Sequence, residues 1–354
     1  MHIGATILFL VTIAVDAQTF SINLSQFGYK KILAGRYSEP AFASLSYVGN
    51  NTLFVTFPTD KYSGGEPFVD YTGIVLSKTG VLLGKIQTKG TLEDVLQRRV
   101  NVQPLSNILI EVGDDLRIYS TDLTSFRAIK LPLGTQLRVP PDRKAVVAIS
   151  PESNKSMDFI IGINGVTSRV NHLDFDERAV RDDLLAVSND ASVAHAIRDS
   201  DGELSVHSWS RRWPAFQIGK HQEPMTFTKD DELLVSVVAE TPFASTYLYL
   251  WKATGKLSKI HGSKAGFYTS AESSQDAARV LLTQTNVSFF GAMLGGFDCD
   301  DCGESYFYSV VDVPSAKVIL KHRKRWNCTE ALSPSGKELA ELCDGVIRFY
   351  PVPQ

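Results

Sequence analysis

The residues with the most distinctive chemistry lie in one short stretch, 297–304, which reads Phe-Asp-Cys-Asp-Asp-Cys-Gly-Glu. Its four carboxylates belong to Asp298, Asp300, Asp301 and Glu304. Carboxylate oxygens suit Ca²⁺, but this spacing is not that of an EF-hand loop. The two cysteines also lack the βαβ context of a thioredoxin-like redox motif. We therefore expect a structural disulfide between Cys299 and Cys302, no metal and no cofactor, and we keep the carboxylates as candidates for ligand binding.

The other two cysteines, Cys328 and Cys343, lie at equal distances on either side of a predicted turn at Ser335-Gly336. In a tight antiparallel hairpin such residues face each other, with Cα atoms ~4.5–5.5 Å apart, which is within disulfide range. The sequence therefore predicts a Cys328–Cys343 disulfide beside the Cys299–Cys302 disulfide. The two other connectivities and a Cys₄ zinc site remain open.

Familiar catalytic patterns are absent from the sequence. It contains no Gly-x-Ser-x-Gly elbow, no phosphate-binding glycine loop and no pair of histidines at metal-ligand spacing. A Ser/His/Asp triad assembles in space and stays open. The formal charge of −3 argues against a nucleic-acid partner. We interpret the basic run 321–325 as part of a solvated loop, compensated by the acidic stretch 297–304.

Short strands must position these groups, because turn-forming clusters followed by apolar runs recur along the chain. The seven clusters are Gly49-Asn50-Asn51, Leu105-Ser106-Asn107, Pro141-Asp142-Arg143, Asn189-Asp190-Ala191, Lys229-Asp230-Asp231, Gln275-Asp276-Ala277 and Pro334-Ser335-Gly336. A second series of turns runs through Thr79, Asp122, Gly165, Ser210 and Thr254, in steps of 43 to 45 residues, and continues at Ser315. A period of about 40 to 45 residues with four strands is the period of a β-propeller blade. The sequence predicts an all-β fold of seven blades.

One motif carries a family resemblance. Ser-Pro-Ser-Gly-Lys-Glu-Leu at 333–339 resembles the Ser-Pro-Asp-Gly-Lys-x-Leu turn of WD40-like β-propellers from bacterial secreted and periplasmic proteins, and Pro140-Pro141-Asp142-Arg143-Lys144 is a second, poorer copy. The Gly-His and Trp-Asp signature of true WD40 repeats is missing. The resemblance implies the fold and says little about function.

In such a fold the turns after the first and third strands of each blade lie on one face, and the other connections lie on the opposite face. The sequence predicts that the long connections all lie on this second face: 58–71, 90–94, 172–183 and 287–305. Binding residues concentrate on loops held by a rigid scaffold. The candidate binding residues are Asp60, Tyr62, Glu66, Asp70, Asp174 and Asp176, together with Asp298, Asp300, Asp301 and Glu304.

The N-terminal residues indicate export. An apolar run at 7–15 precedes Val15-Asp16-Ala17, which suits signal-peptide cleavage after Ala17. We expect a signal peptide at 1–17, one propeller domain at 18–354, and a secreted or periplasmic protein without a membrane span after cleavage. The last blade lacks a fourth strand before the chain ends, so we expect residues 19–24 to complete it and to close the ring.

Two functional hypotheses follow. The first is a monomeric, non-catalytic propeller that binds a protein, peptide or glycan through the long-loop face. The second is a propeller enzyme, either a lactonase-like hydrolase or a quinoprotein-like dehydrogenase, which would need metal or cofactor ligands at the mouth of the channel. A stoichiometric metal in the purified protein would favour the enzyme.

Overall fold

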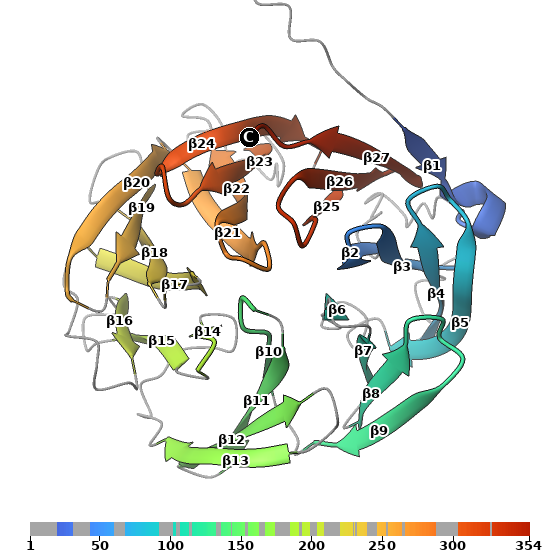
Figure 1. Cartoon of the computed structure of the whole chain (residues 1–354), viewed down its shortest axis with the longest axis horizontal. Helices are drawn as coiled ribbons and strands as arrows, with labels where there is room; N and C mark the ends of the chain where they lie inside the picture. The colour runs from blue at the N-terminus through green and yellow to red at the C-terminus, as the bar shows by residue number, and fades with distance from the viewer. Residues whose placement is uncertain are drawn as a thin grey trace, which may run out of the picture.

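The protein is all-β in its computed structural model (Figure 1). The structure describes residues 20–30, 43–59, 68–91, 102–103, 107–112, 115–131, 136–142, 144–152, 155–162, 167–173, 185–190, 193–198, 204–208, 220–228, 230, 232–238, 246–252, 254–263, 266–287, 304–325 and 328–354. Among these residues, the only helix is the short 3₁₀ helix η1 (Leu24–Phe27), so no described helix is long and apolar enough to cross a membrane.

Seven antiparallel sheets contain all the described strands, and they lie around a circle (Figure 1). The first three sheets contain β2 (Ser44–Gly49), β3 (Thr52–Pro58), β4 (Phe68–Ser77) and β5 (Leu82–Thr91); β6 (Val102–Gln103), β7 (Asn107–Val112), β8 (Asp115–Ser120) and β9 (Phe126–Lys130); and β10 (Gln136–Arg138), β11 (Ala145–Glu152), β12 (Lys155–Gly162) and β13 (Thr167–Leu173). Each sheet pairs its strands in chain order, which is the arrangement of a propeller blade.

The next three sheets follow the same order. They contain β14 (Leu185–Val187), β15 (Val193–Arg198) and β16 (Leu204–Ser208); β17 (Lys220–Phe227), β18 (Leu233–Val238), β19 (Thr246–Trp251) and β20 (Leu257–Ser263); and β21 (Gly266–Ser273), β22 (Arg279–Val287), β23 (Glu304–Asp312) and β24 (Lys317–Lys324). In the four-stranded sheets among these, the first strand lies nearest the centre and the fourth lies on the rim (Figure 1). All seven predicted clusters of the first turn series fall between the first two strands of a sheet.

The last sheet combines the two ends of the chain. Its order is β1-β27-β26-β25, made of β1 (Ser21–Asn23), β27 (Val346–Pro351), β26 (Glu338–Cys343) and β25 (Thr329–Leu332). Ile22 pairs with Ile347 across the β1–β27 ladder, and the Leu24 amide donates to the Gly345 carbonyl at 2.8 Å. The predicted pairing of the N-terminal segment with the last sheet is therefore present, with β1 at the rim.

A five-residue turn recurs between strands. At β25–β26 the Ser333 hydroxyl accepts the Glu338 amide at 3.1 Å, and Gly336 adopts a left-handed φ of 67°. At β21–β22 the Ser274 hydroxyl accepts the Arg279 amide at 3.1 Å in the same way. A hydroxyl at the first position thus fixes the turn, as expected for serine. The predicted Asp344-Gly345 hairpin also has positive φ at both residues, as a type I′ turn requires.

The connections differ between the two ends of the sheets. Turns such as β4–β5 and β23–β24 join the third and fourth strands on the same end as the β21–β22 and β25–β26 turns, and we call this end the turn face. At the other end, which we call the loop face, β3 ends at Pro58 and β4 begins at Phe68, while β22 ends at Val287 and β23 begins at Glu304. Within the sheets, the longest stretches between consecutive strands therefore start and end at the loop face, as predicted, although residues 60–67 and 288–303 themselves lie outside the described residues.

The hydrophobic core is divided among the spaces between neighbouring sheets. The buried cluster between the last and first sheets includes Ile22, Leu24, Phe57, Ile347 and Phe349. Separate clusters fill the spaces between the first and second sheets and between β21–β24 and the last sheet. Because the first and last sheets bury both of their surfaces against their neighbours, a missing neighbour would expose apolar surface.

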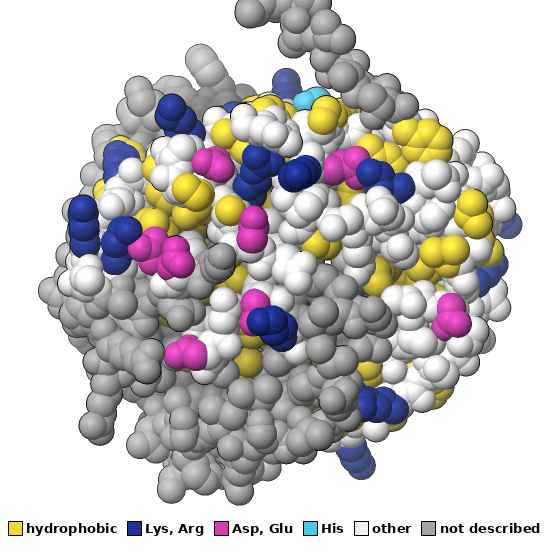
Figure 2. Space-filling model, viewed as in Figure 1, with side chains coloured by type: hydrophobic (Ala, Val, Ile, Leu, Met, Phe, Trp, Pro, Cys, Tyr) yellow, Lys and Arg dark blue, Asp and Glu magenta, His cyan; other side chains and the backbone are white. Residues whose placement is uncertain are grey.

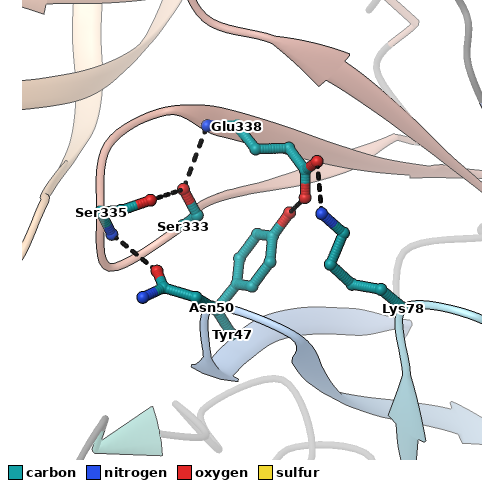
Figure 3. A network of polar contacts seen from close by, with 6 residues as sticks. All are labelled: Tyr47, Asn50, Lys78, Ser333, Ser335 and Glu338. Atoms are coloured by element: carbon teal, nitrogen blue, oxygen red, sulfur yellow. Dashed lines mark hydrogen bonds and ion pairs between the residues drawn. The ribbon is translucent and has the colours of Figure 1, made fainter.

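A polar network joins the last sheet to the first on the turn face (Figure 3). The Tyr47 hydroxyl donates to one oxygen of Glu338 at 2.8 Å, and Lys78 donates to the other at 2.6 Å. The Ser335 amide donates to the Asn50 side-chain oxygen at 3.0 Å. Burial, reinforced by the Glu338 charge, raises the pKa of Tyr47 far above its ordinary value. The hydroxyl therefore stays a donor at all ordinary pH values.

Candidate functional site

Most of the predicted binding residues lie outside the described residues. These are Asp60, Tyr62, Glu66, Asp174, Asp176, Asp298, Asp300 and Asp301, and the same holds for Cys299 and Cys302. Two predicted loop residues are strand residues instead: Asp70 pairs with Lys89 in β4–β5, and Glu304 pairs with Val287 in β22–β23. The prediction placed these strand ends too early, because Phe68-Val69 and Ser305-Tyr306 have strand propensity and extend the ladders toward the loops.

The basic run was also predicted in a loop, and this was wrong. β24 continues through Lys324, so the run is mostly strand. Lys321 lies over the Phe307 ring, with 4.9 Å between Nζ and the ring centroid, and Arg325 pairs with Asp344 at 3.0 Å. The described partners of this run are therefore on its own sheet and on the last sheet. The acidic residues within 298–301 lie outside the described residues, so their compensation of this run stays a prediction.

Lys324 makes a buried ion pair between β24 and the last sheet. Its Nζ lies 2.8 Å from both carboxylate oxygens of Glu330, and the two side chains are 10% and 5% exposed. The Thr283 hydroxyl from β22 donates to the same carboxylate at 2.6 Å. Three strands from two sheets thus hold one carboxylate, which accepts charge-assisted hydrogen bonds.

A second buried carboxyl lies opposite the first. Glu341 pairs with Glu330 across β25–β26 and is 4% exposed. The Tyr350 hydroxyl donates to Glu341 Oε2 at 3.1 Å. Burial raises the pKa of Glu341 above its ordinary value, and the Glu330 charge adds to this, while the Tyr350 hydrogen bond and the charges of His322 and Arg348 oppose it. Glu341 can therefore hold a proton at a pH where an exposed glutamate is ionised.

The Cys328–Cys343 disulfide borders these carboxyls. Its Cα atoms are 4.6 Å apart, and the register that pairs Thr329 with Leu342 puts the two cysteines directly opposite each other. This confirms the predicted pairing. The sulfur atoms and a Glu341 oxygen lie within 4.8 Å of one another, but the sulfurs are bonded to each other and offer no thiolate to a metal. Disulfides of this kind persist in oxidising compartments.

We call Thr283, Lys324, Glu330, Glu341 and Tyr350 the carboxylate cluster. The cluster lies between β21–β24 and the last sheet. Lys324 is at the loop-face end of β24, Glu341 is near the middle of β26, and Tyr350 lies toward the turn face, opposite Leu339. Toward the turn face the same space is filled by an apolar group that includes Leu281, Val310 and Leu339. The inter-sheet packing therefore changes from apolar to charged as it approaches the loop face.

Sequence reasoning missed the two glutamates of this cluster, although a signal was present. Glu330 lies two residues after Cys328, and Glu341 lies two residues before Cys343. In a strand, residues two apart share one face. The predicted hairpin therefore places the carboxyl groups of Glu330 and Glu341 on the same face as the two cysteines. Lys324 had no such signal, because its contact with Glu330 depends on how two sheets pack.

Comparisons with known proteins give a likeness in fold only. No family model matches the chain, and the curated proteins contain no significant match. Similar solved structures include the β-propeller domain of Cps50 (Swd1) from Myceliophteria thermophila, TolB from Acinetobacter baumannii, and streptogramin B lyase. Their identities are 12%, 11% and 9%, with TM-scores of 0.47, 0.42 and 0.45. The matches cover 81%, 82% and 92% of this chain and 94%, 82% and 98% of the other chains. At this level of similarity no activity transfers, and the β-propeller architecture rests on the circle of sheets itself (Figure 1).

Proposed function

We propose that this protein is an exported, monomeric binding protein, a seven-bladed propeller that recognises a protein, peptide or glycan through its loop face. The observation that carries the proposal is the buried Lys324–Glu330 ion pair beside the buried Glu341, at the loop-face end of the last two sheets. Buried charges add little stability compared with apolar packing. Buried groups with a shifted pKa are enriched at functional sites, so the carboxylate cluster favours the loop-face end of these two sheets as the binding surface.

The ring architecture is part of the same proposal. The seven sheets are the full set of blades, and β1 seals the ring by supplying the outer strand of the last blade. Its support is the β1–β27 ladder and the network of Tyr47, Lys78 and Glu338 across the same seam. A sealed ring leaves no open edge between the first and last blades, and it fixes the strand ends from which the loops extend.

Export is supported by the disulfide and by the apolar N-terminal run. Cleavage after Ala17 leaves Phe20 and β1 intact, so the mature chain keeps the strand that the last sheet needs. Sequencing the N-terminus of the secreted protein tests this step. The proposal requires a chain that starts at Gln18, and a mature protein that retains residues 1–17 contradicts it.

The functional test uses two matched charge reversals. Arg325 is an exposed residue on the loop face, and Lys337 is an exposed residue on the turn face. We expect the wild-type protein and Lys337→Glu to capture the same partner from the host's extracellular or envelope fraction, and Arg325→Glu to capture it at least about tenfold less. Equal capture by both variants, or a loss only with Lys337→Glu, would contradict the proposal.

A further inference from the structure

The exposed large hydrophobic side chains of the described residues gather in one arc. They are Phe20, Val81, Leu82, Leu83 and Phe126, and they are 43% to 57% exposed. Each lies at or just before the start of a rim strand: β1, β5 or β9. Since these strands start at the turn face, the five side chains lie at the turn-face end of the outer strands of three neighbouring sheets. Figure 2 shows hydrophobic side chains along the right-hand rim, where Figure 1 draws β1 and β5.

Close contacts between β1, β5 and the β8–β9 turn make the arc continuous. Phe20 stacks on Phe349, with ring centroids 6.2 Å apart. A Cβ atom on Gly80 would lie 3.7 Å from Ile22, so β1 touches the turn that precedes Val81. A Cβ atom on Gly84 would lie 2.2 Å from the Asp122 carbonyl oxygen, so the start of β5 touches the β8–β9 turn. The apolar side chains therefore follow one convex rim and do not line a groove.

The segments that carry the arc are rich in basic residues, although one of these, Lys78, is paired with Glu338. Segments 20–30, 77–91 and 115–131 contain seven basic and two acidic residues, while the whole chain has a formal charge of −3. Lys85 and Lys130 are exposed on the two rim strands beside the apolar side chains. The other sign is present too: hydrogen bonds from Ser120 and Thr124 lower the pKa of the exposed Asp122 to about 2, so this carboxylate stays negatively charged. The arc thus combines apolar tips with flanking lysines.

We propose that this arc docks the propeller onto a membrane surface that carries anionic lipids. Apolar side chains with flanking Lys or Arg are the pattern of interfacial membrane binding, where apolar groups enter the headgroup boundary and cations attract the anionic lipids. The size of the arc also favours a membrane. Five half-exposed side chains form a patch of roughly a few hundred Å², less than the ~800 Å² per partner of a stable protein interface. Side chains on a convex rim can insert into the headgroup region of a membrane, which does not require a partner surface of complementary shape.

The experiment is co-sedimentation with vesicles of phosphatidylcholine alone and of phosphatidylcholine with phosphatidylglycerol. We expect binding to the mixed vesicles and at least about tenfold weaker binding by Leu82→Ser/Phe126→Ser. Lys85→Glu also weakens binding to the mixed vesicles. The matched control is Lys317→Ser, at the exposed start of the rim strand β24, which binds like the wild type. Thermal melts confirm that every variant is folded.

Three outcomes would overturn the proposal. The first is no binding of the folded wild type to the mixed vesicles. The second is equal binding by Leu82→Ser/Phe126→Ser. The third is a concentration-dependent dimer, or a captured protein, that this variant loses while vesicle binding stays unchanged, which would assign the arc to a protein partner. None of these outcomes concerns binding at the loop face. The membrane proposal can therefore be refuted without refuting the proposed function.

Discussion

The hydrogen bond between Tyr47 and Glu338 provides the sharpest test of the seam between the first and last sheets. Tyr47 is 1% exposed, and its hydroxyl lies 2.8 Å from Glu338 Oε1. Tyr47→Phe keeps the ring packing and removes only this bond. A hydrogen bond to a charged group contributes about 1.5–3 kcal/mol. Because Glu338 keeps its Lys78 partner and is 23% exposed, we expect the lower end, about 1.5 kcal/mol.

The assay is urea unfolding of Tyr47→Phe, Glu338→Gln and the double variant. A double-mutant cycle should give a coupling energy of about 1 kcal/mol or more between the two side chains. Tyr268→Phe is the matched control, because the Tyr268 hydroxyl is buried with no partner among the described residues. Removing it should leave stability unchanged or raise it. The reasoning is refuted if Tyr47→Phe unfolds at the wild-type urea midpoint, or if both tyrosine variants lose the same stability.

Three further variants test the last sheet. Leu24→Ala removes a fully buried side chain next to β1 and should cost about 2–5 kcal/mol in urea unfolding, whereas an unchanged midpoint would show that the N-terminal segment does not seal the ring. Glu341→Gln tests the raised pKa of Glu341. Because protonation of Glu341 favours the folded state, the free energy of unfolding of the wild type falls as pH rises toward and through the folded-state pKa. In urea titrations, the stability of the variant relative to the wild type should therefore increase from pH 4 to pH 8. An advantage independent of pH would contradict the burial argument. Replacing Cys328 and Cys343 by serine opens a loop with a sequence separation of 15 and should cost about 3 kcal/mol; equal midpoints for the serine variant and the wild type would show that the disulfide contributes nothing.

Short sequence motifs predicted most of the fold. Ser333-Pro334-Ser335-Gly336 and Asp344-Gly345 each predicted a turn that is present, because serine hydroxyls and residues with positive φ determine turn geometry within a few residues. The Cys328–Cys343 disulfide followed from the same register. Strand ends were less well predicted: β4 and β24 run further than the polar residues Asp70 and Lys324 suggested. A ladder partner can extend a strand past residues of low strand propensity.

The site was harder to predict than the fold, since its contacts cross between sheets. Lys324 and Glu330 are six residues apart in sequence but belong to different sheets, so no spacing rule connects them. The exposed arc had no signal either: Leu82 and Leu83 lie in an ordinary apolar strand pattern, and only the packing of the rim shows that they are exposed. Side-chain exposure depends on the neighbouring sheet, which sequence periodicity does not supply.

The central claim is that the loop face over the last two sheets binds the partner, and hydrogen exchange on the purified complex tests it most directly. Partner binding should slow exchange at the end of β24 and at the Asp344-Gly345 turn, and leave the Ser333–Glu338 turn on the opposite face unchanged. Slowed exchange at the Ser333–Glu338 turn, with no change at Asp344-Gly345, would contradict the account.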